Sequence, residues 1–255
     1  MKVTILGCGN SGGVPLVGND WGTCDPKNPR NRRRRVSILV EEGETTLLVD
    51  TSPDLRQQLL DCNLNNLTAV LYTHTHADHT HGIDDLRSVN WLTQKAIPIY
   101  ANAETMTDLQ TRFGYIFFGS TADRYCRPLL EGHTIDNTMD MKFGSTRVTS
   151  FTQHHGPNIS IGYRFNDFAY STDVNRLDDA AFNALAGIKV WVVDCIRENP
   201  HRTHSHLEQT LEWIKRVKPE RAILTHMDQS MDYETLVAKL PKGIEPAYDG
   251  LEIQC

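Results

Sequence analysis

Residues 71–79 read Leu71-Tyr72-Thr73-His74-Thr75-His76-Ala77-Asp78-His79, and this segment is the most informative in the chain. A β-rich run ends at Thr73, so the polar cluster lies just beyond the C-terminal end of a predicted strand. His74 and His76 are two residues apart in extended chain, so they project to the same side and can bind one metal ion. Asp78 and His79 then turn toward a second position. Burying three histidines and an aspartate within six residues would be costly without a metal, and these side chains suit Zn, Mn or Fe.

Further histidine and aspartate residues follow other predicted strands. His154-His155 follows Arg147–Phe151, Asp173 follows Phe168–Ser171, and His226 follows Arg221–Leu224. Loops at strand ends are where functional sites are normally assembled. Four segments therefore end in a possible metal ligand, and we expect these ends to meet at one rim of the sheets.

Apolar, β-rich runs recur along the chain, with helical stretches between several of them. The predicted strands are Val3–Leu6, Ser37–Val40, Thr46–Val49, Ala69–Tyr72, Ile97–Tyr100, Arg147–Phe151, Ile159–Phe165, Phe168–Ser171, Lys189–Val193 and Arg221–Leu224. One predicted helix starts at Ser52-Pro53, with the proline in the first helical position. A second starts at Ser205 with a capping box to Glu208, and a third covers about Asp232–Lys239. The pattern predicts an α+β sandwich of two packed sheets with helices outside, in one domain spanning residues 1–255.

Composition excludes several classes of protein. The chain has 255 residues, with Lys+Arg 26 against Asp+Glu 32 and a net charge of −6, which argues against a dedicated nucleic-acid binder. No apolar run approaches the roughly 18 residues that a membrane helix needs, and the apolar stretch at the N-terminus is too short for a signal peptide. Six cysteines occur without a CxxC pair, namely Cys8, Cys24, Cys62, Cys126, Cys195 and Cys255. We expect reduced thiols in a cytoplasmic protein without membrane association.

A glycine-rich loop near the N-terminus, Gly7-Cys8-Gly9-Asn10-Ser11-Gly12, matches GxGxxG after a strand. A dinucleotide site would require this loop to open a helix, but Gly13, Pro15 and Gly18 follow it. We therefore interpret the loop as a tight turn near a site. The run Arg32–Arg35 is interpreted as a solvated loop, with a contact to an anionic substrate as the alternative.

The HxHxDH pattern at 74–79, followed in order by His155, Asp173 and His226, resembles the metallo-β-lactamase superfamily. The resemblance covers essentially the whole chain. It implies an αββα sandwich of two mixed sheets with helices on the outer faces and a dinuclear metal site between the sheets. In the family pattern one metal is held by His74, His76 and His155, the other by Asp78, His79 and His226, and Asp173 bridges them. His155 is preferred to His154 because Gly156 follows it, as in the family.

Three further segments resemble the subgroup that contains the phosphoribosyl 1,2-cyclic phosphodiesterase of the carbon–phosphorus lyase pathway. They are residues 7–15, Leu224-Thr225-His226 and Tyr248-Asp249-Gly250-Leu251-Glu252-Ile253. The subgroup also has a histidine outside the metal set and near the phosphate, matched here by His204. The pathway enzyme has an additional structural zinc, held by a cysteine cluster near the N-terminus and by a histidine three residues after the equivalent of His226. This chain keeps only Cys24 in the first region and has Gln229 in place of that histidine. We therefore expect two divalent ions, Mn or Zn, and no third structural zinc.

The resemblance implies a metal-dependent phosphodiesterase that attacks a small cyclic or nucleotide-like phosphodiester with a hydroxide bridging the metals. His204 and the metal-ligating Asp78 are the expected catalytic residues, with His204 acting on the developing charge or the leaving group. The expected partner is a small phosphodiester, without extended nucleic acid or membrane, and a homodimer is left open.

Three alternatives remain. The first is an endoribonuclease resembling tRNase Z, although this chain has no long basic arm and its net charge opposes polyanion binding. The second is a non-hydrolytic metal-binding accessory protein on the same fold. The third is a lactamase or glyoxalase-like hydrolase, because a fold alone does not fix a function. His81 either orients a metal ligand or lies on the surface. We assign Tyr115, Phe117 and Phe118 to the core rather than to a pocket wall on which a nucleotide base would stack.

Overall fold

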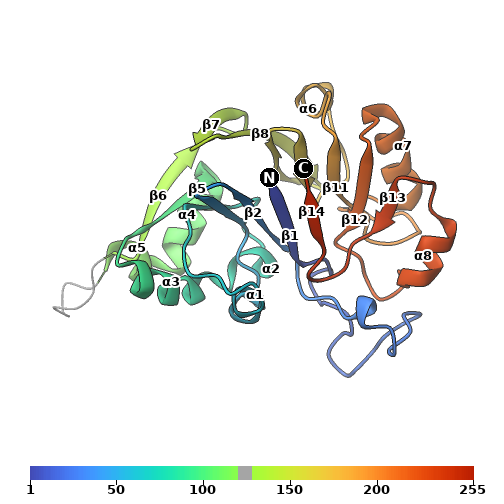
Figure 1. Ribbon diagram of the computed structural model, residues 1–255, viewed down its shortest axis with the longest axis horizontal. Helices are drawn as coiled ribbons and strands as arrows, with labels where there is room; N and C mark the ends of the chain where they lie inside the picture. The colour runs from blue at the N-terminus through green and yellow to red at the C-terminus, as the bar shows by residue number, and fades with distance from the viewer. Residues whose placement is uncertain (120–127) are drawn as a thin grey trace.

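Two mixed sheets form the centre of the computed structural model, which describes residues 1–119 and 128–255 (Figure 1). In these residues each sheet has seven strands. The first sheet has the order β14 (Glu252–Gln254), β1 (Lys2–Gly7), β2 (Ser37–Glu42), β3 (Thr45–Val49), β4 (Ala69–Leu71), β5 (Ile97–Asn102) and β6 (Leu130–Ile135). The second has the order β13 (Ile244–Pro246), β12 (Arg221–Thr225), β11 (Val190–Asp194), β10 (Phe168–Ser171), β9 (Asn158–Phe165), β8 (Thr146–His155) and β7 (Met139–Phe143).

Strand direction follows the same plan in both sheets. Neighbours pair antiparallel from β14 to β3 and from β7 to β10, and they pair parallel from β3 to β6 and from β10 to β13. Because parallel strands end at the same edge of a sheet, the loops after β4, β10 and β12 can meet. The sheets and helices confirm the predicted α+β fold of two mixed sheets with helices outside.

Both faces of strands β1 to β4 of the first sheet are mostly buried, which is why these strands form nearly continuous apolar runs. Leu47 and Val49 point into the core between the sheets, whereas Leu48 packs on the outer side with the helices. That outer layer contains α1 (Leu55–Asp61), α3 (Leu86–Thr93), α4 (Ala103–Arg112) and α5 (Gly114–Phe118). The short α2 (Ala77–Thr80) and the 3-10 turns η1 (Pro29–Asn31) and η2 (Ile83–Asp85) complete this part of the chain.

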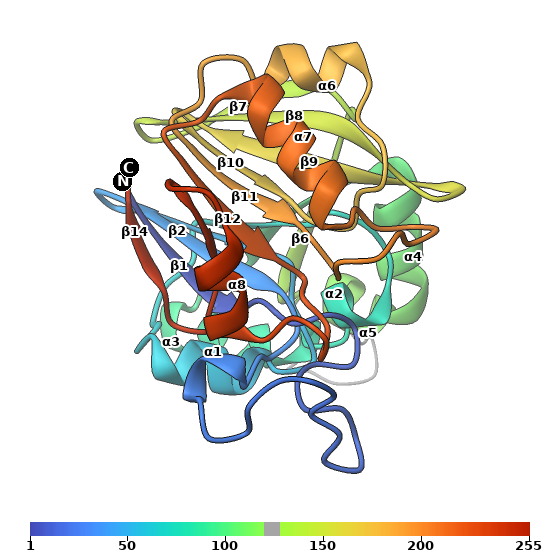
Figure 2. The same cartoon turned by 90° about the vertical axis from the view of Figure 1, so that its right-hand side faces the viewer.

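The second sheet is covered by α6 (Asp179–Ala184), α7 (Leu207–Val217) and α8 (Tyr233–Lys239), which Figure 2 shows from the side of α7 and α8. Phe182, Trp213 and Leu236 anchor these three helices in the core. Side-chain caps fix several helix starts: Asp178 accepts a hydrogen bond from the N–H of Ala181, and Asp232 accepts one from the N–H of Thr235.

Each predicted strand overlaps an observed one, but β6, β7, β13 and β14 were not predicted. The helix ending at Lys239 is also observed. Two predicted helix starts are wrong. The first helix begins at Leu55, because Ser52 instead accepts a hydrogen bond from the N–H of Asp54 in a preceding turn. The helix near residue 207 begins without the predicted capping box, because the Ser205 hydroxyl donates to the carbonyl of Asp194.

The segment between β1 and β2 crosses the lower edge of the molecule in Figure 1 and contains the arginine run. Arg32 is exposed and its guanidinium lies 4.9 Å from the centre of the Trp21 ring. Arg33, in contrast, is 2% exposed and donates to the carbonyl oxygens of Met231 at 2.5 Å and Asp228 at 3.2 Å. The interpretation of the run as a solvated loop is therefore wrong for Arg33, which ties the loop to the segment after β12.

Some expectations about single side chains also need correction. Of the three aromatic residues assigned to the core, only Phe117 is buried, whereas Tyr115 and Phe118 are 54% and 65% exposed. Cys8, Cys24, Cys62, Cys195 and Cys255 are free thiols, and Cys126 lies outside the described residues. In residues 1–119 and 128–255 no helix has the length and apolar character that a membrane crossing requires.

Replacing Arg33 tests whether this buried guanidinium stabilises the fold. We expect Arg33→Ala to lower the free energy of unfolding by about 2–4 kcal/mol, because it leaves the carbonyl of Met231 without this donor, removes one of the two donors to the carbonyl of Asp228, and opens a cavity. Arg32→Ala is the matched control and should cost about 1 kcal/mol or less, because that side chain is exposed. Urea denaturation of both variants measures the difference, and equal stabilities would contradict the assignment.

Candidate metal centre

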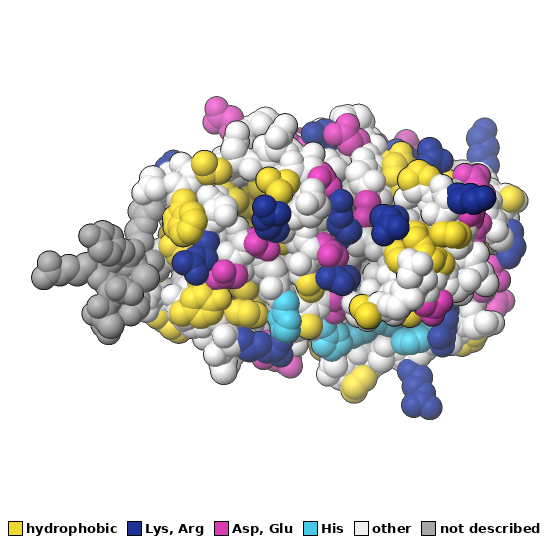
Figure 3. Space-filling view, turned by 90° about the horizontal axis from the view of Figure 1, so that it is seen from below, with side chains coloured by type: hydrophobic (Ala, Val, Ile, Leu, Met, Phe, Trp, Pro, Cys, Tyr) yellow, Lys and Arg dark blue, Asp and Glu magenta, His cyan; other side chains and the backbone are white. Residues whose placement is uncertain are grey.

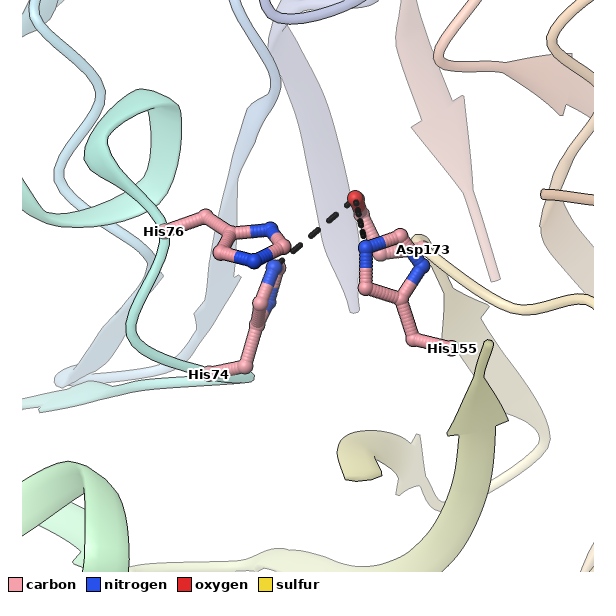
Figure 4. Close-up of side chains that lie close together, drawn as sticks. All are labelled: His74, His76, His155 and Asp173. Carbon is pink, nitrogen blue, oxygen red and sulfur yellow. Dashed lines mark ion pairs between the residues drawn. The ribbon is translucent and has the colours of Figure 1, made fainter. Parts of the chain in front are cut away.

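One cluster of side chains joins the ends of β4, β8 and β10 at the rim between the sheets (Figure 4). It contains His74, His76, His155 and Asp173. The Oδ1 atom of Asp173 lies 3.8 Å from Nε2 of His74 and 3.6 Å from Nε2 of His155. The ring of His76 lies 4.5 Å from that of His74, centre to centre. Each residue has a potential ligand atom within 4.8 Å of those of the others, so the four can surround one ion.

A second cluster shares Asp173 with the first and adds Asp78, His79 and His226. The other carboxylate oxygen of Asp173, Oδ2, lies 3.1 Å from Nε2 of His79 and 3.2 Å from Nε2 of His226. Asp78 Oδ2 lies 3.3 and 3.6 Å from the same two nitrogens. All seven residues expected to bind metal thus lie in two groups that share Asp173.

Buried ring nitrogens in these clusters show that the residues suit a cation. Nε2 of His74, His79 and His226 is buried and has no hydrogen-bond partner among the described residues. Buried polar atoms in folded proteins nearly always have a partner, so three such nitrogens around one carboxylate call for an ion. Imidazole nitrogens and carboxylate oxygens are the donor set that Zn and Mn accept.

The opposite ring nitrogen of three histidines is held by the protein. Nδ1 of His74 lies 3.0 Å from Thr73 Oγ1, Nδ1 of His155 lies 2.7 Å from the carbonyl of Thr203, and Nδ1 of His79 lies 2.7 Å from Oδ2 of Asp50. Such contacts fix which nitrogen faces a metal. Asp50 was missed by the sequence analysis. Its signal is a lone carboxylate directly after the buried run Thr46–Val49.

Three residues of the site adopt left-handed backbone conformations that favour glycine. The φ angles are +62° at Asp50, +54° at Asp173 and +60° at His226. Each such residue costs about 1 kcal/mol or more and persists only where its surroundings enforce it. The strain is therefore concentrated where the strands end and their side chains must converge.

The carboxylates and histidines control each other's ionisation. Burial opposes the charge on Asp173, but the neighbouring His226 and His79 outweigh it and hold the pKa of this carboxyl well below its usual value. Burial likewise lowers the pKa of His226, yet Asp173 and Asp78 raise it to about 9. His74 behaves in the opposite way, because burial and the nearby His79 lower its pKa. The site is thus a buried set of charges that balance one another.

His204 lies beside the two clusters without belonging to either of the groups that meet at Asp173. Its Nδ1 lies 3.0 Å from Oδ2 of Asp194, and its Nε2 lies 3.8 Å from Oδ1 of Asp173. Its ring stacks on that of His226 at 4.6 Å. Asp194, the last residue of β11, was also missed by the sequence analysis. The same oxygen of Asp194 accepts the N–H of Val174, so it connects His204 to the residue after Asp173.

The remaining residues of interest lie away from the clusters. His154 pairs through its backbone with Arg176, and only His155 joins the metal groups. His81 is exposed, and its ring lies 5.9 Å from that of Phe113. In the described part of the chain its side chain makes no hydrogen bond, ion pair or ring contact with the proposed metal-binding side chains. Cys24 lies 3.9 Å from Nη1 of Arg33, and Gln229 accepts the N–H of Thr23 through its carbonyl. Histidine side chains reach the surface along a hollow on the face shown in Figure 3.

A family model described as the beta-lactamase superfamily domain matches residues 45–227, which include every residue of the two clusters. Among solved structures, one titled as a new diphosphatase from the PhnP family is similar to this chain with a TM-score of 0.91. The two sequences are 32% identical, and the alignment covers 99% of this chain and 96% of the other.

Curated relatives carry more varied names. The chain is 29% identical over 255 residues to the octanoyltransferase of Porphyromonas gingivalis, but it spans only 51% of that protein. It is 27% identical over 233 residues to a ribonuclease Z of Mycobacterium sp. (strain KMS), with 80% of this chain and 81% of the relative covered. The octanoyltransferase name belongs to a protein about twice as long, so it does not assign an activity to the half matched here.

Asp50 provides a test of the cluster that does not depend on a substrate. The wild-type chain should bind about two Mn or Zn ions, and Asp50→Ala should weaken binding about 10–100-fold, because His79 loses the group that orients it. Asp54→Ala removes a nearby carboxylate that pairs with Arg35 and should leave metal binding unchanged. Competition against a chromophoric chelator gives the affinities, and wild-type affinity in a folded Asp50→Ala protein would contradict the role given to Asp50.

Proposed function

The chain belongs to the metallo-β-lactamase superfamily as a metal-dependent hydrolase, and we propose that it cleaves a small cyclic or nucleotide-like phosphodiester at a dinuclear metal centre. The observation that carries the choice of substrate is the pair formed by His204 and Asp194. His204 faces the shared carboxylate Asp173 at 3.8 Å while Asp194 binds the opposite nitrogen of its ring, and His204 belongs to neither of the two groups that meet at Asp173.

The two clusters supply the proposed ligands. His74, His76 and His155 would hold one ion, Asp78, His79 and His226 would hold the other, and Asp173 would contribute one oxygen to each. Bound divalent ions supply Lewis-acid charge for the phosphoryl oxygens and a nucleophile that is active near neutral pH. The family and the donor set support Mn or Zn in these positions.

His204 is suited to move a proton during cleavage. The Asp194 carboxylate accepts the hydrogen bond from Nδ1, which leaves Nε2 facing the site, where it accepts a proton in the neutral ring and donates one in the imidazolium form. From there the ring can neutralise charge developing on a phosphoryl oxygen or protonate the leaving alkoxide. A thioester or lactam would need less of this help, so the pair favours a phosphodiester.

A small substrate is favoured by the net charge of the chain. The chain has a net charge of −6, which opposes binding of a long polyanion, whereas a single phosphodiester can be bound by cations in the clusters alone. We propose no nucleic-acid or membrane partner. The similarity to ribonuclease Z makes an endoribonuclease the second candidate.

A side-by-side substrate panel tests the proposal. We expect turnover of bis(p-nitrophenyl) phosphate and of a 2′,3′-cyclic nucleotide with Mn or Zn, and no specific cut in pre-tRNA under the same conditions. Specific cleavage of pre-tRNA would favour the endoribonuclease. Tight metal binding without hydrolysis of any substrate would favour the non-hydrolytic accessory protein.

A His204 variant tests the role of the side chain. His204→Ala should retain both metal ions but lower kcat for a phosphodiester about 10²–10⁴-fold, the usual contribution of a general acid or base. His206→Ala is the matched control, since that residue lies at the start of α7 without a side-chain capping bond and should leave kcat unchanged. Unchanged turnover by His204→Ala with metal retained would reject the assigned role.

A further inference from the structure

His226 is held differently from the other proposed ligands. The Nδ1 atoms of His74, His79 and His155 each contact an oxygen of the protein, but neither ring nitrogen of His226 has a hydrogen-bond partner among the described residues. Its ring is stacked between those of His204 and His79, at 4.6 and 6.0 Å. Its backbone is left-handed at φ +60°. Besides this stacking and the carboxylates that face Nε2, the backbone position of His226 sets where the side chain lies.

Those contacts come from the glycine-rich loop after β1. The N–H of Met227, the residue after His226, donates to the carbonyl of Cys8 at 2.9 Å. The carbonyl of Met227 accepts the N–H of Asn10 at 3.2 Å, and Gly9 forms a parallel bridge with Met227. The loop thus acts as a short partner strand for the segment that carries His226.

The loop is in turn fixed by a carboxylate from the far end of the chain. Oδ1 of Asp249 accepts the N–H of Cys8 at 3.2 Å, and Oδ2 accepts the N–H of Arg34 at 2.8 Å. Gly9 completes the junction by donating its N–H to the carbonyl of Arg34 at 2.8 Å. Three segments, at residues 8–10, 34–35 and 249, are therefore joined by one side chain whose two oxygens each take a backbone donor.

Close packing at this junction explains the glycines of the loop. A Cβ atom on Gly9 would lie 3.0 Å from the carbonyl oxygens of Arg33 and Arg34, and one on Gly7 would lie 2.1 Å from the carbonyl oxygen of Arg35. Gly7 and Gly9 of the GxGxxG pattern therefore serve the close approach of two backbones, as expected of a tight turn near a site. It also makes the position of the loop sensitive to whatever fixes Cys8 and Arg34.

We propose that Asp249 is a positioning residue for the metal centre, which fixes His226 through the backbone of Cys8, Gly9 and Met227. The inference rests on the proposed metal centre and adds to it a residue outside both clusters. Loss of hydration raises the pKa of the Asp249 carboxyl to about 7, so burial disfavours its charged form, while the N–H groups of Arg34 and Cys8 favour it. The two backbone N–H groups are the reason for an aspartate here.

Asp249→Asn provides the sharpest test, because it keeps the shape of the side chain and one acceptor oxygen. The new amide group places a donor against one of the two backbone N–H groups. We expect the affinity for one of the two ions to fall about 10-fold or more while the other ion binds as in the wild type. In metal-free protein, amide hydrogen exchange should become faster in the segment 225–228 and stay unchanged in the segment around His74.

Asp61→Asn is the matched control. Asp61 also pairs with Arg34, at 2.7 Å, but through the arginine side chain on the surface. It should change neither metal affinity nor exchange. If Asp249→Asn fails to fold, Gly9→Ala disturbs the same junction without touching Asp249 and should produce the same loss at one ion.

Two results would overturn the inference. The first is wild-type binding of both ions and wild-type exchange in a folded Asp249→Asn protein. The second is an equal loss of both ions, which would indicate a general loss of structure. Because neither readout uses a substrate, a wild-type chain that fails to hydrolyse phosphodiesters would reject the proposed function and leave this inference standing.

Discussion

The structure depends on one buried carboxylate, Asp173, and on the positive or coordinating groups that surround it. The side chain is 2% exposed, and the ring nitrogens of five histidines lie within 3.8 Å of its oxygens. A buried carboxylate without partners would cost several kcal/mol. The histidines that surround it come from both sheets. The loops after β4, β8, β10 and β12 have to converge on it, and the left-handed backbones at Asp50, Asp173 and His226 are the local cost of that convergence.

Much of this arrangement could be predicted from the sequence, because two kinds of signal are local. The apolar runs of ten strands are local signals, and both faces of several strands are buried, as Leu47 and Leu48 illustrate. The HxHxDH segment is a local signal as well. His155, Asp173 and His226 were found because each follows a recognisable strand, and the resemblance to a family set their grouping. Whether they bind metal as grouped remains a prediction that the proposed titrations address.

Residues that act through distant partners were not predictable in this way. Asp50 and Asp194 are single carboxylates at strand ends, and their roles depend on His79 and His204, which lie 29 and 10 residues away. Arg33 appeared to belong to a solvated run, because nothing near it in the sequence shows that the segment after β12 folds back over it. The strands β6 and β7 are exposed at half or more of their positions, and β13 and β14 have only three residues each, so all four carry weak patterns. Ser205 was misassigned because its hydroxyl had a better acceptor in the carbonyl of Asp194 than in the helix start.

The division of the proposed ligands between the two sheets has a consequence for how the protein resists unfolding. His74, His76, Asp78 and His79 follow β4 of the first sheet, whereas His155, Asp173 and His226 belong to the second. Ions bound by both sets, as proposed, would act as a cross-link that exists only while the sheets are packed together. By mass action, a free ion concentration 100 times the dissociation constant adds about 2.7 kcal/mol to the stability of the packed state. Chelation should therefore loosen the seam between the sheets before it affects either sheet, and the protein would lose resistance to proteolysis there first.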